Sequence, residues 1–109
     1  MSVRSYGQVW LHIIWGTKNH EKSLTDKILR NKLTAYFQNY CSEKEIYLKA
    51  IFINPDHVHL LIDLPVDKSI ADILHLLKGS SSHWINQQVS FKFSWAKGYA
   101  VFSVSSSII

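Results

Sequence analysis

The sequence predicts an α+β fold of the ferredoxin-like type, with the element order β-α-β-β-α-β. Four short segments are rich in β-branched and aromatic residues and are expected to be strands, at 9–15, 47–53, 57–64 and 99–104. Two longer segments, beginning near residues 23 and 70, carry apolar residues at helical spacing. Such a chain forms one antiparallel sheet with both helices on one face, and 109 residues suffice for a single domain.

The first strand is expected to be central in the sheet, because both faces of residues 9–15 are largely apolar. A polar loop containing Lys18 follows it. Ser23 or Thr25 can cap the first helix, which is expected to run to about Ser42. One apolar stripe on this helix is expected to form core rather than a binding platform: Leu29, Leu33, Tyr36, Phe37 and Tyr40.

The second helix begins with a capping signal. Ser69 is followed three residues later by Asp72, which is the spacing of a capping box. Gly79 either ends this helix or is tolerated within it. An aromatic and basic connector at 90–95 then leads to the last strand. The core face of the helix is expected to consist of Ile70, Ile73, Leu74 and Leu77.

Composition limits the class of protein. An apolar fraction of 47% argues against disorder, and a net charge of +4 makes a polyanionic partner plausible. Cys41 is the only cysteine, which excludes an intramolecular disulfide and fits a reducing compartment. The sequence shows neither a signal pattern nor an apolar run of membrane-spanning length, so we expect a cytoplasmic protein with no membrane contact.

The strand that begins near His57 carries the most informative residues. Asn-Pro-Asp at 54–56 favours a turn, so the strands on either side of it are expected to form a hairpin. Side chains alternate between the faces of a strand, and the even-numbered residues from 58 to 64 are all aliphatic. These are expected to face the core, which places His57 and His59 side by side on the opposite, open face with Leu61 and Asp63.

A histidine pair held on a strand is well placed to bind a divalent metal. Two histidines fall short of a complete site, so the simpler interpretation is two solvent-facing side chains. His12 could supply a third ligand if its side chain shares the face of His57, but a satisfied interior histidine is the interpretation that the sequence favours. Four further side chains are less well placed as ligands: Asp56, Asp63, Gln87 and Gln88.

Four ordered segments resemble parts of one known family. Residues 55–62, with His57-Val58-His59 at their centre, resemble the His-hydrophobe-His signature of the single-tyrosine HUH transposases of insertion sequences and REP elements. Residues 11–18 are similar to the family's first strand, 77–86 to its second helix, and 92–105 to the segment ahead of its catalytic helix. Several motifs in order at matching separations make this resemblance more specific than a His-x-His alone.

The resemblance implies metal-dependent DNA chemistry. His57 and His59 would bind Mg²⁺ or Mn²⁺, which polarises a phosphodiester of single-stranded DNA. A tyrosine attacks the phosphorus and leaves a 5′-phosphotyrosine and a free 3′-hydroxyl, so a second strand can be joined without ATP. Family members recognise DNA hairpins and usually work as homodimers. The side chains expected to contact DNA are Lys18, Lys78, Ser80, Ser81 and Lys97, although a serine run is otherwise typical of a solvated turn.

The sequence departs from the family pattern at its end. The family's tyrosine lies on a helix after the Ser-Val-Ser strand, with a glutamine one turn later that completes the metal shell. Residues 105–109 offer no counterpart to either. We therefore expect one domain over residues 1–109 that is truncated before the catalytic helix and is cleavage-deficient. Tyr99 is a poor substitute nucleophile, because its ring is expected to pack in the last strand.

Two other functions fit the same sequence. A non-catalytic ferredoxin-like module would bind nucleic acid by stacking bases on exposed aromatic side chains of the sheet. A metal-dependent phosphoesterase would use the histidine pair without a covalent intermediate. Exposed sheet aromatics favour the module, whereas a metal at His57 and His59 favours the transposase.

Overall fold

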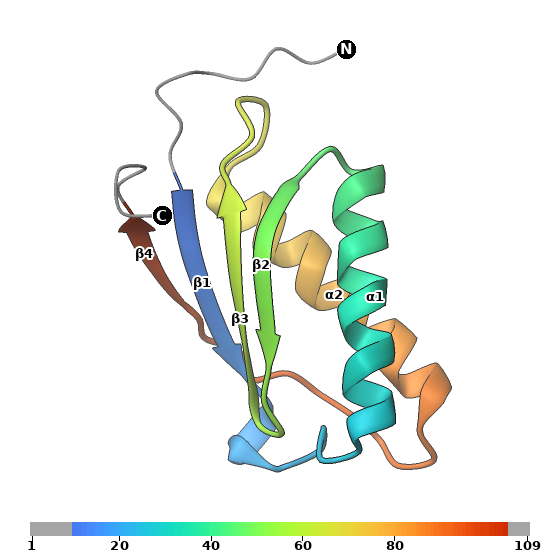
Figure 1. Ribbon diagram of the computed structural model, residues 1–109. Coiled ribbons are helices and arrows are strands. Elements are labelled where there is room, and N and C mark those ends of the chain that lie inside the picture. The colour runs from blue at the N-terminus through green and yellow to red at the C-terminus, as the bar shows by residue number, and fades with distance from the viewer. Residues whose placement is uncertain (1–9, 105–109) are drawn as a thin grey trace.

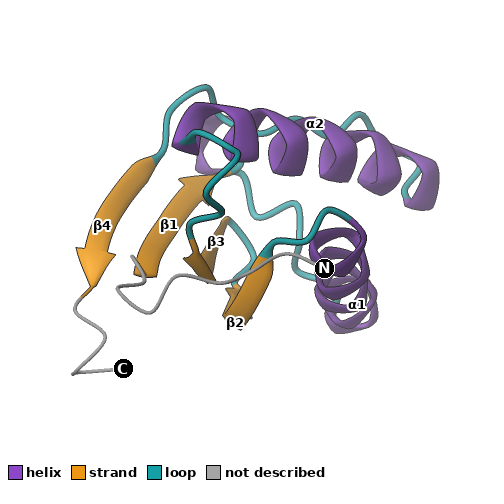
Figure 2. Cartoon of the chain, turned by 90° about the horizontal axis from the view of Figure 1, so that it is seen from above, coloured by secondary structure: helices purple, strands orange, loops and turns teal. Residues whose placement is uncertain are grey.

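The computed structural model describes residues 10–104 and has four antiparallel strands in the order β2-β3-β1-β4 (Figure 1). The two helices lie on the same side of this sheet (Figure 2). The predicted ferredoxin-like fold is therefore confirmed. Its elements are β1 (Trp10–Gly16), a short 3-10 turn (Lys18–His20), α1 (Lys27–Glu43), β2 (Tyr47–Ile53), β3 (His57–Asp63), α2 (Ile70–Gln88) and β4 (Ala100–Val104). Predictions that concern Val9 and residues 105–109 lie outside the described residues.

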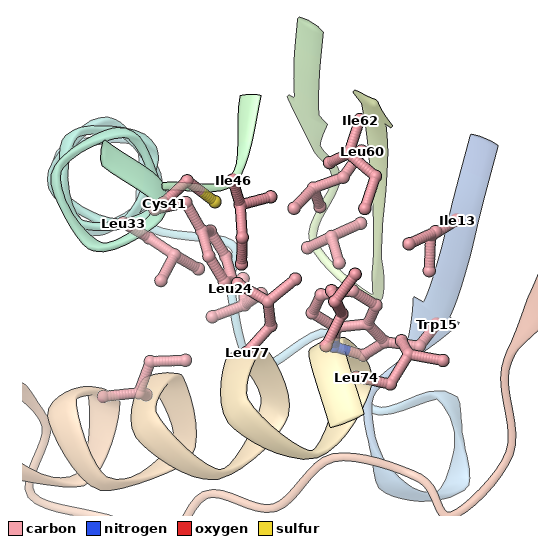
Figure 3. Close-up of a cluster of buried hydrophobic side chains, with 14 of the residues drawn as sticks. Ile13, Trp15, Leu24, Leu33, Cys41, Ile46, Leu60, Ile62, Leu74 and Leu77 are labelled. Atoms are coloured by element: carbon pink, nitrogen blue, oxygen red, sulfur yellow. The ribbon is translucent and has the colours of Figure 1, made fainter. Parts of the chain in front are cut away.

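The core lies between the sheet and the two helices. Val58, Leu60 and Ile62 of β3 are completely buried, which confirms the alternation predicted for this strand. Strand β1 is central, as predicted, and contributes Ile13 and Trp15 beside them. Figure 3 shows Ile13, Trp15, Leu60 and Ile62 in one cluster with side chains of α1 and α2. Helix residues of the cluster include Leu33, Phe37, Cys41, Leu74 and Leu77.

The sequence predicts the N-terminal cap of α2 correctly but not that of α1. The capping box of α2 is confirmed, because the Ser69 hydroxyl accepts from the Asp72 amide at 3.1 Å while the Asp72 carboxylate accepts from the Ser69 amide at 3.4 Å. The predicted cap of α1 is wrong. Asp26 caps that helix by accepting from the Ile28 amide at 2.9 Å, and the Thr25 hydroxyl instead donates to the Lys22 carbonyl.

The sole cysteine is part of the core. Cys41 is buried on α1, and burial raises the pKa of its thiol to about 12. A thiol in this state is a poor nucleophile and metal ligand, so Cys41 serves packing. Among the described helices, none is long and apolar enough to cross a membrane.

Helix α2 runs through Gly79 without interruption, which settles the choice left open by the sequence. A β-carbon at Gly79 would meet nothing within 4 Å. We predict that Gly79→Ala stabilises the protein by about 0.5–1 kcal/mol, because alanine costs less backbone entropy in a helix interior. Chemical denaturation measures the change.

Gly16→Ala is the matched control. Its β-carbon would lie 3.3 Å from the Asp56 carbonyl oxygen, which is held in place by the Thr17 amide at 2.9 Å. This substitution should lower the stability. A loss of stability in Gly79→Ala, or a gain in Gly16→Ala, would contradict the described backbone.

Candidate metal and nucleic-acid site on the open face of the sheet

The face of the sheet opposite the helices carries three imidazoles on its two central strands. His57 and His59 project from β3, and the antiparallel register places Gly16 opposite His57 and Ile14 opposite His59. His12 of β1 lies opposite Leu61, so it reaches His59 diagonally across the strands. His12 therefore shares the face of the pair, which was the condition set for it as a third ligand.

His57 is held by its neighbours in the hairpin turn. Its Nδ1 lies 2.7 Å from Oδ1 of Asp56, and its Nε2 lies 3.1 Å from Nδ2 of Asn54. A carboxylate can only accept, so Nδ1 carries the hydrogen, and the lone pair on Nε2 of the neutral ring accepts from the Asn54 amide. A metal on Nε2 of His57 would have to replace that hydrogen bond. The hydrogen bond from His57 also lowers the pKa of the Asp56 carboxyl. Asp56 thus supports the histidine as well as the turn.

His59 contacts both of the other imidazoles. Its Nδ1 lies 3.0 Å from Nε2 of His12, and its ring centroid lies 4.9 Å from that of His57. Burial lowers the pKa of His59, and the nearby His57 and His12 lower it further. The neutral ring that this favours is the form that binds a metal.

The donor set fits part of a divalent metal site. His57 and His59 offer two imidazoles with the neutral form favoured at His59, but residues 10–104 contain no group of three or more His, Cys, Asp or Glu arranged to hold an ion. Asp63 lies at the far end of β3 from His57. Gln87 and Gln88 are exposed at the end of α2, in the helix layer. The described residues therefore supply two protein ligands.

Aromatic side chains flank the imidazoles on the outer strands. Phe52 of β2 lies opposite His59 and is 64% exposed, and Phe102 of β4 lies opposite His12 and is 54% exposed. Their ring centroids are 6.3 Å and 6.2 Å from those of His59 and His12. An aromatic surface of this kind can stack unpaired bases. The sequence analysis did not place these two residues at the site, because it did not give the residue-by-residue pairing of the strands.

A hollow of about 400 Å³ opens beside His57. Its wall includes Gly16, His20 and the segment that precedes β4. Tyr99 lies on this wall and is 51% exposed, so the expectation that its ring packs is wrong. Lys18 is exposed in the turn that follows β1, and Lys97 is exposed in the segment before β4. Both are free to contact a phosphate.

The structure corrects two of the predicted DNA contacts. The ammonium group of Lys78 donates to the carbonyl oxygens of Ala96, Lys97 and Gly98 at 2.7, 3.2 and 3.3 Å, and burial lowers its pKa. The Ser81 hydroxyl is completely buried and accepts from Nε1 of Trp95 at 2.9 Å. Both side chains therefore hold the connector against α2.

Ser80 keeps a partly accessible side chain but satisfies its hydroxyl within the helix. It donates to the Leu77 carbonyl oxygen at 3.4 Å, one turn back along α2. Asn86 completes the attachment of the connector, because its side-chain amide donates to the Phe93 carbonyl at 3.0 Å and accepts from the Phe93 amide at 2.8 Å. The serine run is thus part of a helix, and the alternative of a solvated turn does not apply.

We predict that Ser81→Ala lowers the free energy of unfolding by about 1–2 kcal/mol, because the Trp95 indole N–H loses its acceptor. Hairpin DNA affinity of the folded variant should not change. Ser80→Ala is the control, with an expected loss below about 0.5 kcal/mol. Thermal unfolding and a gel-shift titration measure the two quantities. A stable Ser81→Ala protein with weakened DNA binding would restore Ser81 as a DNA contact.

Two sequence comparisons give the same result. The family model described as IS200-like transposase matches residues 5–109 of the chain. The chain is 25% identical over 100 residues to the transposase for insertion sequence element IS200 of Salmonella typhimurium strain LT2, and equally to that of Salmonella typhi. The alignment covers 85% of this chain and 65% of each relative, so the chain spans just under two thirds of their length.

Solved structures show the same fold. A crystal structure of a Deinococcus radiodurans R1 protein assigned as a transposase has a TM-score of 0.84 and 25% identity, covering 99% of this chain and 88% of that one. The REP-associated tyrosine transposase bound to a REP hairpin has a TM-score of 0.66 and 15% identity, covering 97% of this chain and 63% of that one. Since the family model matches nearly the whole sequence, the chain belongs to the IS200-like transposase family.

Proposed function

We propose that this chain is the DNA-binding core of an HUH-type transposase, in which His57 and His59 hold Mg²⁺ or Mn²⁺ against a phosphodiester of single-stranded hairpin DNA. The observation that carries the proposal is the pair itself. Both rings lie on the open face, and each has its Nδ1 engaged by a neighbouring side chain. This arrangement resembles metal-binding histidines, whose second nitrogen is usually held by a hydrogen bond.

The metal, when bound, would supply Lewis-acid polarisation of the phosphodiester. The chain's own residues bind and orient the DNA. Phe52 and Phe102 offer faces on which unpaired bases stack beside the imidazoles. Lys18 and Lys97 are exposed near the His57 end of the sheet and bind backbone phosphates. The relative bound to a REP hairpin supports a hairpin as the form of DNA to test.

We propose that residues 10–104 bind DNA without cutting it. Tyr36 and Tyr40 stack on each other in the helix layer, with ring centroids 5.9 Å apart, and Tyr47 lies at the end of the sheet far from His57. Tyr99 alone among the described tyrosines borders the hollow beside His57. A labelled hairpin incubated with Mn²⁺ should give no covalent protein–DNA band on a denaturing gel. A band that Tyr99→Phe removes would make Tyr99 a nucleophile.

The proposal includes a homodimer in the cytoplasm. Strand β4 lies at an edge of the sheet. A second copy that pairs along this edge would protect its unpaired backbone groups. The single cysteine of the sequence, Cys41, fits the reducing cytoplasm. Sedimentation tests the dimer, and a strictly monomeric profile at high concentration would contradict it.

We predict that the double variant His57→Ala, His59→Ala loses Mn²⁺ binding while its unfolding transition is kept, because both side chains lie off the core face. Isothermal titration calorimetry measures the binding, and His75→Ala with His83→Ala on the exposed face of α2 is the control. Unchanged binding in the first variant, or loss in the control, would place the metal elsewhere.

The same binding should weaken as the pH falls, because a protonated imidazole cannot ligate a metal. The pKa of His59 is lowered, so its neutral form persists below the ordinary histidine value of about 6.5. Because the unfolded chain binds this proton more readily, the free energy of unfolding falls as the pH drops through the ordinary histidine value and levels off below the lowered pKa of His59. Calorimetric titrations with Mn²⁺ at a series of pH values measure the effect.

We predict that affinity for a hairpin oligonucleotide falls steeply with salt, because Lys–phosphate contacts release counterions. Lys18→Ala with Lys97→Ala should reduce the logarithmic salt slope by about 2, roughly one for each lysine that no longer neutralises a phosphate. Lys32→Ala, exposed on α1, is the control and should leave the slope unchanged. A flat salt response of the unaltered protein would argue against DNA as the partner.

The exposed aromatics also support a second candidate, a non-catalytic module that stacks bases on the sheet. The two functions predict different dependence on metal. For the module, hairpin binding survives EDTA and the histidine double variant but is lost with Phe52→Ala and Phe102→Ala. For the transposase core, hairpin binding weakens with EDTA and in the histidine double variant as well as in the two phenylalanine variants.

A further inference from the structure

The contact between His12 and His59 is fixed by the sheet. Nε2 of His12 lies 3.0 Å from Nδ1 of His59, which is a hydrogen-bond distance between the two rings. The two residues belong to β1 and β3, the central strands of the sheet, whose antiparallel pairing runs from Trp10 to Gly16 (Figure 1). The register therefore fixes how the two residues face each other across the strands.

Two neutral imidazoles share one hydrogen in such a contact, and its direction has a chemical consequence. If His12 donates, Nδ1 of His59 accepts and the hydrogen of His59 resides on Nε2, which then has no lone pair for a metal. If His59 donates from Nδ1, its Nε2 keeps the lone pair. The identity of the donor therefore decides whether His59 can ligate through its outer nitrogen.

His57, two residues earlier on the same strand, also needs a partner that keeps its hydrogen on Nδ1. Its Nδ1 faces the Asp56 carboxylate at 2.7 Å, and a carboxylate fixes the direction because it has no hydrogen to donate. At His59 the corresponding partner is His12. The two strand histidines thus each have an Nδ1 partner, one from the preceding residue and one from the neighbouring strand.

We propose that His12 is a positioning residue that accepts the Nδ1 hydrogen of His59 and keeps Nε2 of His59 available for the metal. This rests on the proposed function. When His59 ligates through Nε2, its Nδ1–H would be a stronger donor to His12, so the hydrogen bond and metal binding would reinforce each other. The proposal differs from the role of a third ligand, because Nε2 of His12 is occupied by the hydrogen bond.

The test reads the tautomer of His59 directly, in protein free of metal. Long-range ¹H–¹⁵N NMR correlations of ¹⁵N-histidine-labelled protein should show the Nδ1–H form of His59. His12→Phe keeps a ring without an acceptor, so the Nε2–H form of His59 should increase and Mn²⁺ affinity should fall about 10- to 100-fold. His12→Gln offers an amide oxygen that can accept, and should restore much of both.

His75→Phe is the control, because it makes the same substitution on the exposed face of α2 and leaves the contact between His12 and His59 in place. In this variant the tautomer of His59 and the Mn²⁺ affinity should match those of the unaltered protein. An Nε2–H form of His59 in the unaltered protein, or no change in His12→Phe, overturns the proposal. Complete loss of Mn²⁺ in His12→Phe and His12→Gln, with the His59 tautomer unchanged, makes His12 a ligand and also overturns it.

These outcomes are separable from failure of the proposed function. If the unaltered protein binds no Mn²⁺ at all, the metal-dependent function fails. The tautomer in metal-free protein still decides the direction of the hydrogen bond. If Mn²⁺ binds and depends on His57 but not on His12, the function stands and the positioning role fails.

Discussion

The antiparallel pairing of β1 with β3 determines both the core and the candidate site. It places Ile13 beside Leu60 and Trp15 beside Val58 on the buried face, where all four side chains are at most 2% exposed. The same register sets His12 and His59 within hydrogen-bonding distance on the other face. A slip by one residue would bury the imidazoles and expose the aliphatic row, so core packing itself fixes the geometry of the site.

The strand order determines where the imidazoles and the exposed aromatic rings lie on the open face. The imidazoles come from the two central strands, while the exposed rings of Phe52 and Phe102 come from the two outer strands. A nucleic acid lying across the sheet would meet stacking surfaces on both sides of the histidines. The helix layer takes no part in this face and serves mainly to bury its underside. Lys78 and Ser81 extend that structural role, because they fasten the connector that leads into β4.

Elements with a local signal could be predicted from the sequence. The alternation of β3, the turn at 54–56 and the Ser69–Asp72 capping box each depend on residues that are close in the chain. Features that depend on distant residues could not. The connector at 89–99 has no periodicity, so nothing in the sequence indicated that it returns along α2 and occupies Lys78 and Ser81. Predicting the contact of His12 with His59 would have required the strand register as well as the topology. The start of α1 was mispredicted because Ser23, Thr25 and Asp26 are all residue types that cap helices, and Asp26 is the one that does so.

In our proposal, the open face at His57 and His59 is the metal site of this transposase core. Paramagnetic broadening by substoichiometric Mn²⁺, followed residue by residue in ¹H–¹⁵N NMR spectra, locates the bound ion without requiring activity. We expect residues 57–59 and their β1 partners, Trp15 and Gly16 among them, to broaden first, while His75 and His83 on α2 stay sharp. Broadening that begins at the acidic start of α2, around Asp67 and Asp72, or that spreads evenly over the chain, would contradict a metal site at the histidine pair.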